Sequence, residues 1–237
     1  MKRTLPFIII LVVLGAAVGS ALYFTRSAPG SSATVSNPTN TSSAPTTAPQ
    51  PPVTGGVPGA DPPHTLGLPN APAHLEEFGD FQCPPCGMFD PILRQMHGQF
   101  GDKLQITFRE FPLTPTHQHA LAAASAAEAA GVQGKFWEMH DLLYEHQNDW
   151  KDKFDVRPIF EGYATQIGLN LDRYRSDLSG EAVAQRIFMD GKRGHSMGVK
   201  GTPTVFLNGS EVPFETLMAP EKLRVVIQSA IDANGTR

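Results

Sequence analysis

The stretch EEFGDFQCPPCGMF, residues 76–89, contains both cysteines of the chain, Cys83 and Cys86. The residues before them, Ala73 to Phe81, have the pattern of a strand, and the residues after them repeat apolar side chains at helical spacing as far as about Phe100. The stretch therefore predicts a strand, a Cys-x-x-Cys motif and a helix in direct succession.

Three roles are open to such a cysteine pair. A structural disulfide across so short a loop stabilises a chain by only about 2 kcal/mol. A zinc site needs about four ligands, and there is no second cysteine pair. His117 and His119 could add imidazoles, but they are better explained as ordinary polar residues, so we expect no metal site.

A redox role fits the cysteine pair best. The strand-to-helix position places Cys83 at a helix N-terminus, where free N–H groups and the helix dipole lower a thiol pKa from about 8.5. Cys83 is then the attacking sulfur, and Cys86, one turn inside the helix, resolves the mixed disulfide.

The N-terminus predicts a membrane anchor. After Lys2 and Arg3, the run from Leu5 to Phe24 contains no charged residue and is long enough to span a membrane as a helix. A cleaved signal peptide is the alternative, with Gly19-Ser20-Ala21 as a cleavage site. We interpret residues 1–24 as a cytoplasmic tip and transmembrane signal-anchor, since the flanking positive charges keep the N-terminus inside. The rest of the chain is then extracytoplasmic, and it is secreted if the segment is cleaved.

Residues 25–72 are rich in Ser, Thr and Pro and predict a disordered linker, because they contain too few large apolar side chains to form a core. The composition changes at Ala73. Residues 73–116 predict a β-α-β unit that contains the cysteines, and residues 117–198 predict a series of helices without a strand. Residues 199–237 return to β-β-α, with a hairpin at Asn208-Gly209.

Four stretches together are similar to the DsbA-like family of thioredoxin-fold thiol–disulfide oxidoreductases. They are EFGDFQCPPCGMF, FREFPLTPTHQHALAAASAAEAA, GKFWEMHDLLYEHQ and GTPTVFLNG, and the resemblance covers about residues 65–231. It implies an α/β thioredoxin fold with an inserted helical subdomain between the β-α-β half and the β-β-α half. The same order of elements follows from the sequence pattern.

The resemblance also implies roles for three residues outside the motif. Glu77 matches a buried acid beneath the cysteine pair, which takes or relays the proton of Cys86; Glu76 is the alternative, but alternation places Glu77 on the face of Leu75. Pro203 matches the family's cis-proline, which faces the cysteines and binds the substrate chain. Thr202 then lies against Cys83 and helps to tune it.

The two prolines of the motif bear on its redox potential. Pro84 and Pro85 have no N–H and cannot donate to a Cys83 thiolate, although they restrain the loop. The most oxidising relatives have a histidine where Pro85 stands. We therefore expect the pKa of Cys83 to be lowered but to stay above the value of about 3.5 that is found in the most oxidising cases.

Together these features predict an extracytoplasmic thiol–disulfide oxidoreductase that donates disulfides to proteins with free thiols. A membrane redox partner would recycle it, no cofactor is expected, and we expect a monomer. The net charge of −4 argues against nucleic acid as a partner. The same pair could instead act as a disulfide reductase or isomerase. A third hypothesis assigns the protein to another functional class, as a redox-inactive thioredoxin-like binding module or metallochaperone.

Overall fold

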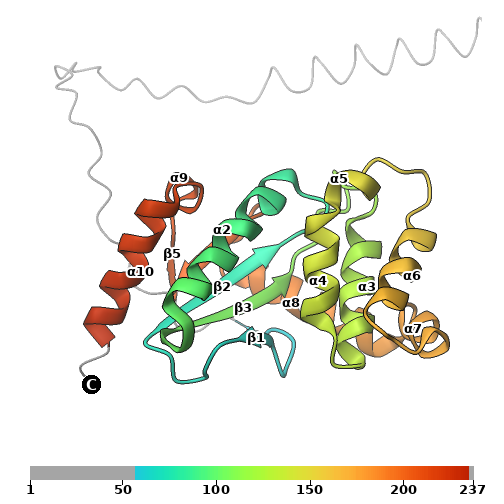
Figure 1. The fold of residues 1–237 in the computed structure, drawn as a ribbon, viewed down its shortest axis with the longest axis horizontal. Helices are drawn as coiled ribbons and strands as arrows, with labels where there is room; N and C mark the ends of the chain where they lie inside the picture. The colour runs from blue at the N-terminus through green and yellow to red at the C-terminus, as the bar shows by residue number, and fades with distance from the viewer. Residues whose placement is uncertain (1–56, 235–237) are drawn as a thin grey trace, which may run out of the picture. The chain divides into compact units, whose positions relative to one another are not determined.

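The computed structural model describes residues 57–234 (Figure 1). The predicted anchor at residues 1–24 and the linker as far as residue 56 lie outside the described residues. Among the described residues, no helix has both the length and the apolar content needed to cross a membrane.

The described part is built on a mixed sheet of five strands in the order β1-β3-β2-β4-β5. Its central strand β2 pairs in parallel with β3 and antiparallel with β4, and the short β1 pairs antiparallel with the outer side of β3. The strand bounds are β1 (His64–Leu66), β2 (Ala73–Gly79), β3 (Leu104–Glu110), β4 (Thr204–Leu207) and β5 (Ser210–Glu211).

The predicted order of elements is confirmed, with α2 between β2 and β3, a series of helices between β3 and β4, and a closing helix after the hairpin. The helices are α2 (Pro84–Phe100), α3 (Ala120–Val132), α4 (Phe136–Glu145), α5 (Gln147–Trp150), α6 (Arg157–Gln166), α7 (Leu171–Asp177), α8 (Glu181–Ser196), α9 (Phe214–Leu217) and α10 (Pro220–Asn234), with a 3-10 turn at Gly101–Lys103.

Helices α2 and α10 cover one face of the sheet. The apolar faces that the sequence predicted for them pack on β2, β3 and β4 and form one core. Its members are Ala73, Leu75, Phe89, Leu93, Met96, Leu104, Ile106, Val205, Leu207, Val212, Leu217, Leu223, Ile227 and Ile231. This packing fixes the axis of α2 and hence the position of the cysteines at its start.

The opposite face of the sheet is covered by α8. Gly194 lies so close to the sheet that a Cβ at this position would come within 2.7 Å of the Phe111 ring and 3.0 Å of the Phe78 ring. The predicted helical insertion at residues 117–198 included α8, but the structure places α8 against β3 as a layer of the sandwich. The helices that are added to the thioredoxin half are therefore α3 to α7.

The inserted helices pack around α3, whose buried positions are mostly alanines. Small side chains let α4 and α8 approach α3 closely, and the larger residues Phe136, Met139, Leu143, Trp150 and Tyr174 fill the space around it. The same core includes both cysteines and Phe81, so the insertion covers one side of the motif.

The hairpin predicted at Asn208-Gly209 is present between β4 and β5. Both turn residues have positive φ, +50° at Asn208 and +82° at Gly209, which is the conformation that Asn-Gly turns favour.

The predicted linker ends earlier than the sequence indicated. Within residues 57–72, β1 pairs with β3, the Ala60 N–H donates to Asp190 at 2.7 Å, and His64 pairs with the buried Glu128 at 2.9 Å. The predicted boundary at residue 72 is wrong because these few residues order themselves through long-range polar contacts, which composition does not reveal.

Candidate active site

Cys83 and Cys86 lie at the start of α2, as predicted. Cys83 is the N-cap residue, with φ −69° and ψ 119°, and its N–H donates to the Asp80 carbonyl at 3.0 Å. Cys83 is 4% exposed and Cys86 is fully buried. Both are free thiols in the structure.

The two thiols have opposite acidities. A hydrogen bond from the Cys86 side chain, the largest influence, lowers the pKa of Cys83 to about 6 against the opposing effect of burial. Burial, followed by the same hydrogen bond and the nearby Glu77, raises the pKa of Cys86 well above its usual value. At neutral pH Cys83 is thus the thiolate and Cys86 the thiol, which is the division of roles expected from the sequence.

The Thr202–Pro203 peptide bond is cis and lies against the cysteine pair. Cys83 Sγ donates to the Thr202 carbonyl oxygen at 3.3 Å, and the Thr202 side chain also lowers the pKa of Cys83. Among the described residues, no partner contacts the buried Thr202 hydroxyl, so its O–H is free to donate to a Cys83 thiolate. The structure thus places Thr202, and with it the cis bond to Pro203, beside Cys83.

Glu77 is the buried acid of this site. It is 2% exposed on β2, and burial, with smaller contributions from Asp90 and Cys83, raises its pKa to about 8. Glu77 is therefore mostly protonated at neutral pH, and its proton is available beside Cys86.

Glu76 is also buried, but it has a different role. It points to the α8 face of the sheet, where it forms ion pairs with Arg109 at 2.8 Å and Arg193 at 2.7 Å. These arginines keep the pKa of Glu76 lowered although burial acts to raise it. Successive side chains of β2 point to opposite faces of the sheet, so Glu76 and Glu77 lie on different faces. Both are buried because β2 is covered on both faces.

The prolines occupy the first turn of α2, where their missing N–H groups leave no helical bond unmade. Pro84 is exposed and Pro85 is half-buried. The pKa of about 6 for Cys83 agrees with the expectation of a moderate shift.

Sequence reasoning missed the polar residues that support the motif. Gln147, from α5, donates to the Phe81 carbonyl at 2.7 Å and to the Cys83 carbonyl at 2.9 Å. Asp80 accepts from the N–H groups of Gln82 and Leu113 at 2.8 and 2.9 Å. No local pattern marks Gln147, because its partners lie more than sixty residues away in the chain.

The histidines predicted to be ordinary polar residues are part of this support. His117 pairs with Asp80 at 2.7 Å, and the His119 N–H donates to the Gln82 side chain at 2.6 Å. The His117 imidazole and the His119 backbone therefore order the loop between β3 and α3 against the residues that precede Cys83.

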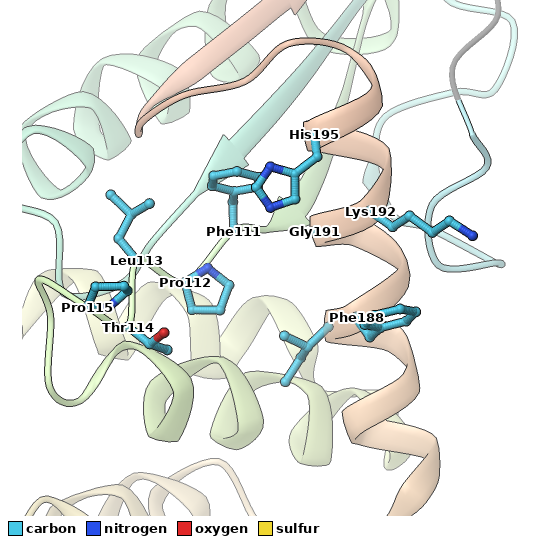
Figure 2. Close-up of a pocket in the computed structure, with 10 residues that line it drawn as sticks. Phe111, Pro112, Leu113, Thr114, Pro115, Phe188, Gly191, Lys192 and His195 are labelled. Carbon is cyan, nitrogen blue, oxygen red and sulfur yellow. The ribbon is translucent and has the colours of Figure 1, made fainter. Parts of the chain in front are cut away.

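A cavity of about 550 Å³ opens between that loop and α8, away from the cysteines. In Figure 2 the Phe111 and His195 rings lie side by side at one end, and Phe188 projects from α8. Neither cysteine lines this cavity, so we do not assign it to the exchange site.

The chain is similar to known proteins in sequence and in fold. The thioredoxin family model Thioredoxin_4 matches residues 60–229. Among solved structures, BdbD from Bacillus subtilis has a TM-score of 0.63 and 22% identity over 76% of this chain and 100% of BdbD. The α-DsbA1 protein of Wolbachia pipientis has a TM-score of 0.63 and 18% identity over 75% of this chain and 94% of its own.

Curated relatives in sequence are named as Na⁺/H⁺ antiporters. NhaA 1 of Salinispora arenicola is 43% identical over 150 residues, which are 63% of this chain but only 22% of the antiporter. NhaA 1 of Mycolicibacterium gilvum is 37% identical over 150 residues, 62% of this chain and 23% of its own. The chain thus spans less than a quarter of these relatives, and their name says nothing of its activity.

The fold and the site are those of a thioredoxin-like protein, and the fold is similar to those of BdbD and α-DsbA1. The chain belongs to the Thioredoxin_4 family, with five described helices, α3 to α7, inserted into its thioredoxin half.

Proposed function

We propose that this protein is a thiol–disulfide oxidoreductase that donates its Cys83–Cys86 disulfide to proteins with free thiols. The observation that carries the proposal is the reduced pair itself, with an acidic Cys83 at the helix N-terminus and a cis Thr202–Pro203 bond beside it. A stabilised Cys83 thiolate favours the reduced form and so makes the disulfide a better oxidant.

The exchange proceeds in two steps. A substrate thiolate attacks Cys83 of the disulfide, a mixed disulfide forms, and Cys86 leaves as a thiolate that takes a proton from Glu77. A second substrate thiolate then attacks the substrate sulfur of the mixed disulfide and releases Cys83 as a stable thiolate. Two substrate thiols become one disulfide, the protein disulfide becomes the Cys86 thiol and the Cys83 thiolate, and one proton goes to solvent.

Substrate would bind in extended form along the Thr202–Pro203 segment. Pro203 has no N–H and leaves the neighbouring backbone groups to the substrate chain, while the exposed Pro84 forms the other side of the approach to Cys83. Proteins with free thiols or with disulfides are therefore the proposed partners.

The location belongs to the proposal as well. An anchor at residues 1–24 would hold the folded part outside the cytoplasm, where a membrane redox partner returns Cys83 and Cys86 to the disulfide. Membrane fractionation of the full-length protein, with protease accessibility of the folded part from outside, tests this location. Recovery only in the cytosol would contradict it.

The direction of electron flow is tested by the redox potential. A thiol pKa of about 3.5 accompanies a redox potential of about −120 mV, and a pKa of about 7 accompanies about −270 mV. The pKa of Cys83, about 6, lies between these two values, so we expect an intermediate potential. Equilibration with glutathione measures it. A redox potential as low as about −270 mV would instead indicate that the protein is a reductase.

Two variants separate the oxidoreductase from a redox-inactive binding module. Cys86→Ser should trap a mixed disulfide through Cys83 with a disulfide-bonded substrate protein, whose disulfide is the oxidant and whose second sulfur leaves as a thiol, and Cys83→Ser should trap none. Equal substrate oxidation by the wild type and by Cys83→Ser would rule out the proposed chemistry.

A further inference from the structure

A second polar cleft lies where the thioredoxin half meets the helical insertion. It has a volume of about 310 Å³ and lies between α2 and α4, with Leu66 and Ile106 of the sheet in its wall. Asp90, Arg94 and His97 line it from α2, and Trp137, His140 and Asp141 line it from α4. Cys83 and Cys86 are not among the lining residues.

Three side chains of this cleft form a compact set of metal-binding donors. Asp90, His140 and Asp141 each offer one ligand atom, and these atoms all lie within 4.8 Å of one another. One imidazole nitrogen with two carboxylate oxygens is a donor set for zinc and neighbouring transition metals, whereas calcium and magnesium take oxygen ligands.

The His140 Nδ1 already pairs with Asp141 Oδ1 at 3.0 Å, but two other polar atoms of these residues are buried without a hydrogen-bond partner among the described residues. They are Asp90 Oδ1 and His140 Nε2, on residues that are 3% and 2% exposed. Buried polar atoms are rarely left unpartnered, because each forfeits its hydrogen bonds to water. An ion bound to Asp90 would use the free carboxylate oxygen, while ligation through one imidazole nitrogen fixes the proton on the other.

The cleft already holds one positive charge, on Arg94. Its guanidinium lies 2.8 Å from Asp90 Oδ2 and 3.9 Å from Asp141 Oδ2. The Arg94 side chain is 44% exposed, so it can turn into solvent at small cost. Arg94 therefore occupies the place of a cation between the two carboxylates and would compete with a metal ion.

We propose that Asp90, His140 and Asp141 bind one divalent transition-metal ion, with solvent from the cleft in the fourth position. The site joins α2 to α4, one ligand coming from the thioredoxin half and two from the insertion. No sequence pattern marks this cluster, because Asp90 lies far from His140 and Asp141 in the chain and meets them through packing alone.

Zinc titration of the full-length protein tests the site. The Cys83→Ser/Cys86→Ser background removes the thiols, which would bind zinc themselves. Isothermal titration should show one ion per chain in this background. Asp141→Asn should weaken the affinity at least tenfold, and Arg94→Gln should strengthen it, because the competing guanidinium is gone. Asp141 is 43% exposed, so its substitution leaves the fold intact.

The opposite signs of these two effects distinguish a site from surface binding. His146→Gln is the matched control, since His146 also pairs with an aspartate, Asp149, but on the exposed surface at 3.1 Å. Its zinc affinity should equal that of the background. The visible spectrum of bound Co²⁺ is a second readout, and Asp141→Asn should abolish it.

Two results would overturn the proposal. One is the absence of zinc binding in both the background and Arg94→Gln. The other is binding that Asp141→Asn leaves unchanged.

Discussion

Cys83 and Thr202 are 119 positions apart in the sequence, yet the reactivity of the first depends on the second. The Thr202 carbonyl accepts a hydrogen bond from the Cys83 thiol, and the Thr202 hydroxyl is free to donate one to the thiolate once it forms. The residue before the cis-proline therefore acts on the acidity of the nucleophile as well as on the shape of the loop.

Thr202→Val should raise the pKa of Cys83. The loss of one hydrogen bond to the thiolate corresponds to about 0.5–1 pKa unit. The pH dependence of the alkylation rate of the reduced protein measures this pKa. Thr165→Val, which removes an exposed hydroxyl that donates to Glu161, is the control and should leave it unchanged. A lower pKa in Thr202→Val would show that the hydroxyl does not stabilise the thiolate.

Glu77 makes the folded state sensitive to pH. Its pKa of about 8 is above the ordinary glutamate value of 4.5, so the folded protein holds this proton over a range where the unfolded chain has lost it. The contribution of Glu77 to stability is therefore complete below about pH 4.5 and is lost as pH rises through 8.

Glu77→Gln should remove this loss of folding stability at rising pH. Relative to its parent, the variant should gain stability between pH 5 and 9, up to the order of 5 kcal/mol. Urea unfolding across this range, in the Cys83→Ser/Cys86→Ser background so that thiol ionisation does not contribute, measures the difference. A difference that does not change with pH would mean that Glu77 is ionised in the folded protein.

At the scale of elements, α8 is attached to the sheet by charge as well as by apolar packing. Glu76 of β2 binds Arg193 of α8, and Arg109 of β3 binds both Glu76 and Asp190 of α8. These groups are largely buried, so each charge depends on its partners to offset the loss of water. Since α8 leads directly to the Thr202–Pro203 loop, this network also helps to hold that loop beside Cys83.

Glu76→Ala should destabilise the protein by about 3–5 kcal/mol, because it leaves Arg109 and Arg193 buried without their shared partner. Chemical denaturation of the oxidised protein measures the loss. Asp155→Ala breaks an ion pair with Arg157 on the surface and is the matched control, for which we expect little change. Equal effects of the two substitutions would show that the buried network contributes no more than a surface pair.

For the whole molecule, the residues before β2 are part of the fold. Arg109 donates to the Ala60 carbonyl at 2.8 Å, Arg193 donates to the Val57 carbonyl at 3.3 Å, and His64 stacks on Phe136 with ring centroids 3.6 Å apart. The segment from residue 57 to β1 thus connects α8, the sheet and the insertion.

Deletion of residues 57–72 should lower the melting temperature by about 10 °C or more. The deletion removes β1 and the partners of buried acids, a loss of several kcal/mol in a domain where 1 kcal/mol shifts Tm by about 2–4 °C. Thermal unfolding followed by circular dichroism measures it. Deletion of residues 41–56, equal in length and without large apolar side chains apart from Val53, should cause little change. Similar shifts for both deletions would argue against a structural role for residues 57–72.

Much of this architecture could be predicted from the sequence. Alternation in β2 and β3, helical spacing in α2 and α10, and Asn208-Gly209 in the hairpin are local patterns, and the family resemblance connected Cys83 with Pro203. The boundary of the linker, the place of α8 and the support from Gln147 could not be predicted, since each depends on contacts between distant segments.

The sequence by itself thus determined the order of elements and the cysteine pair at a helix start, and alternation placed Glu77 on the same face of its strand as Leu75. These depend on periodicity and on neighbours within a few residues, where the physical rules are local. Only the tertiary structure decided which groups meet across the chain: the Thr202 carbonyl at Cys83, Gln147 beneath it, and Asp90 beside His140 and Asp141. Such meetings depend on how the insertion packs on the thioredoxin half. The hydrogen bonds made there lower the pKa of Cys83, and burial raises the pKa values of Cys86 and Glu77.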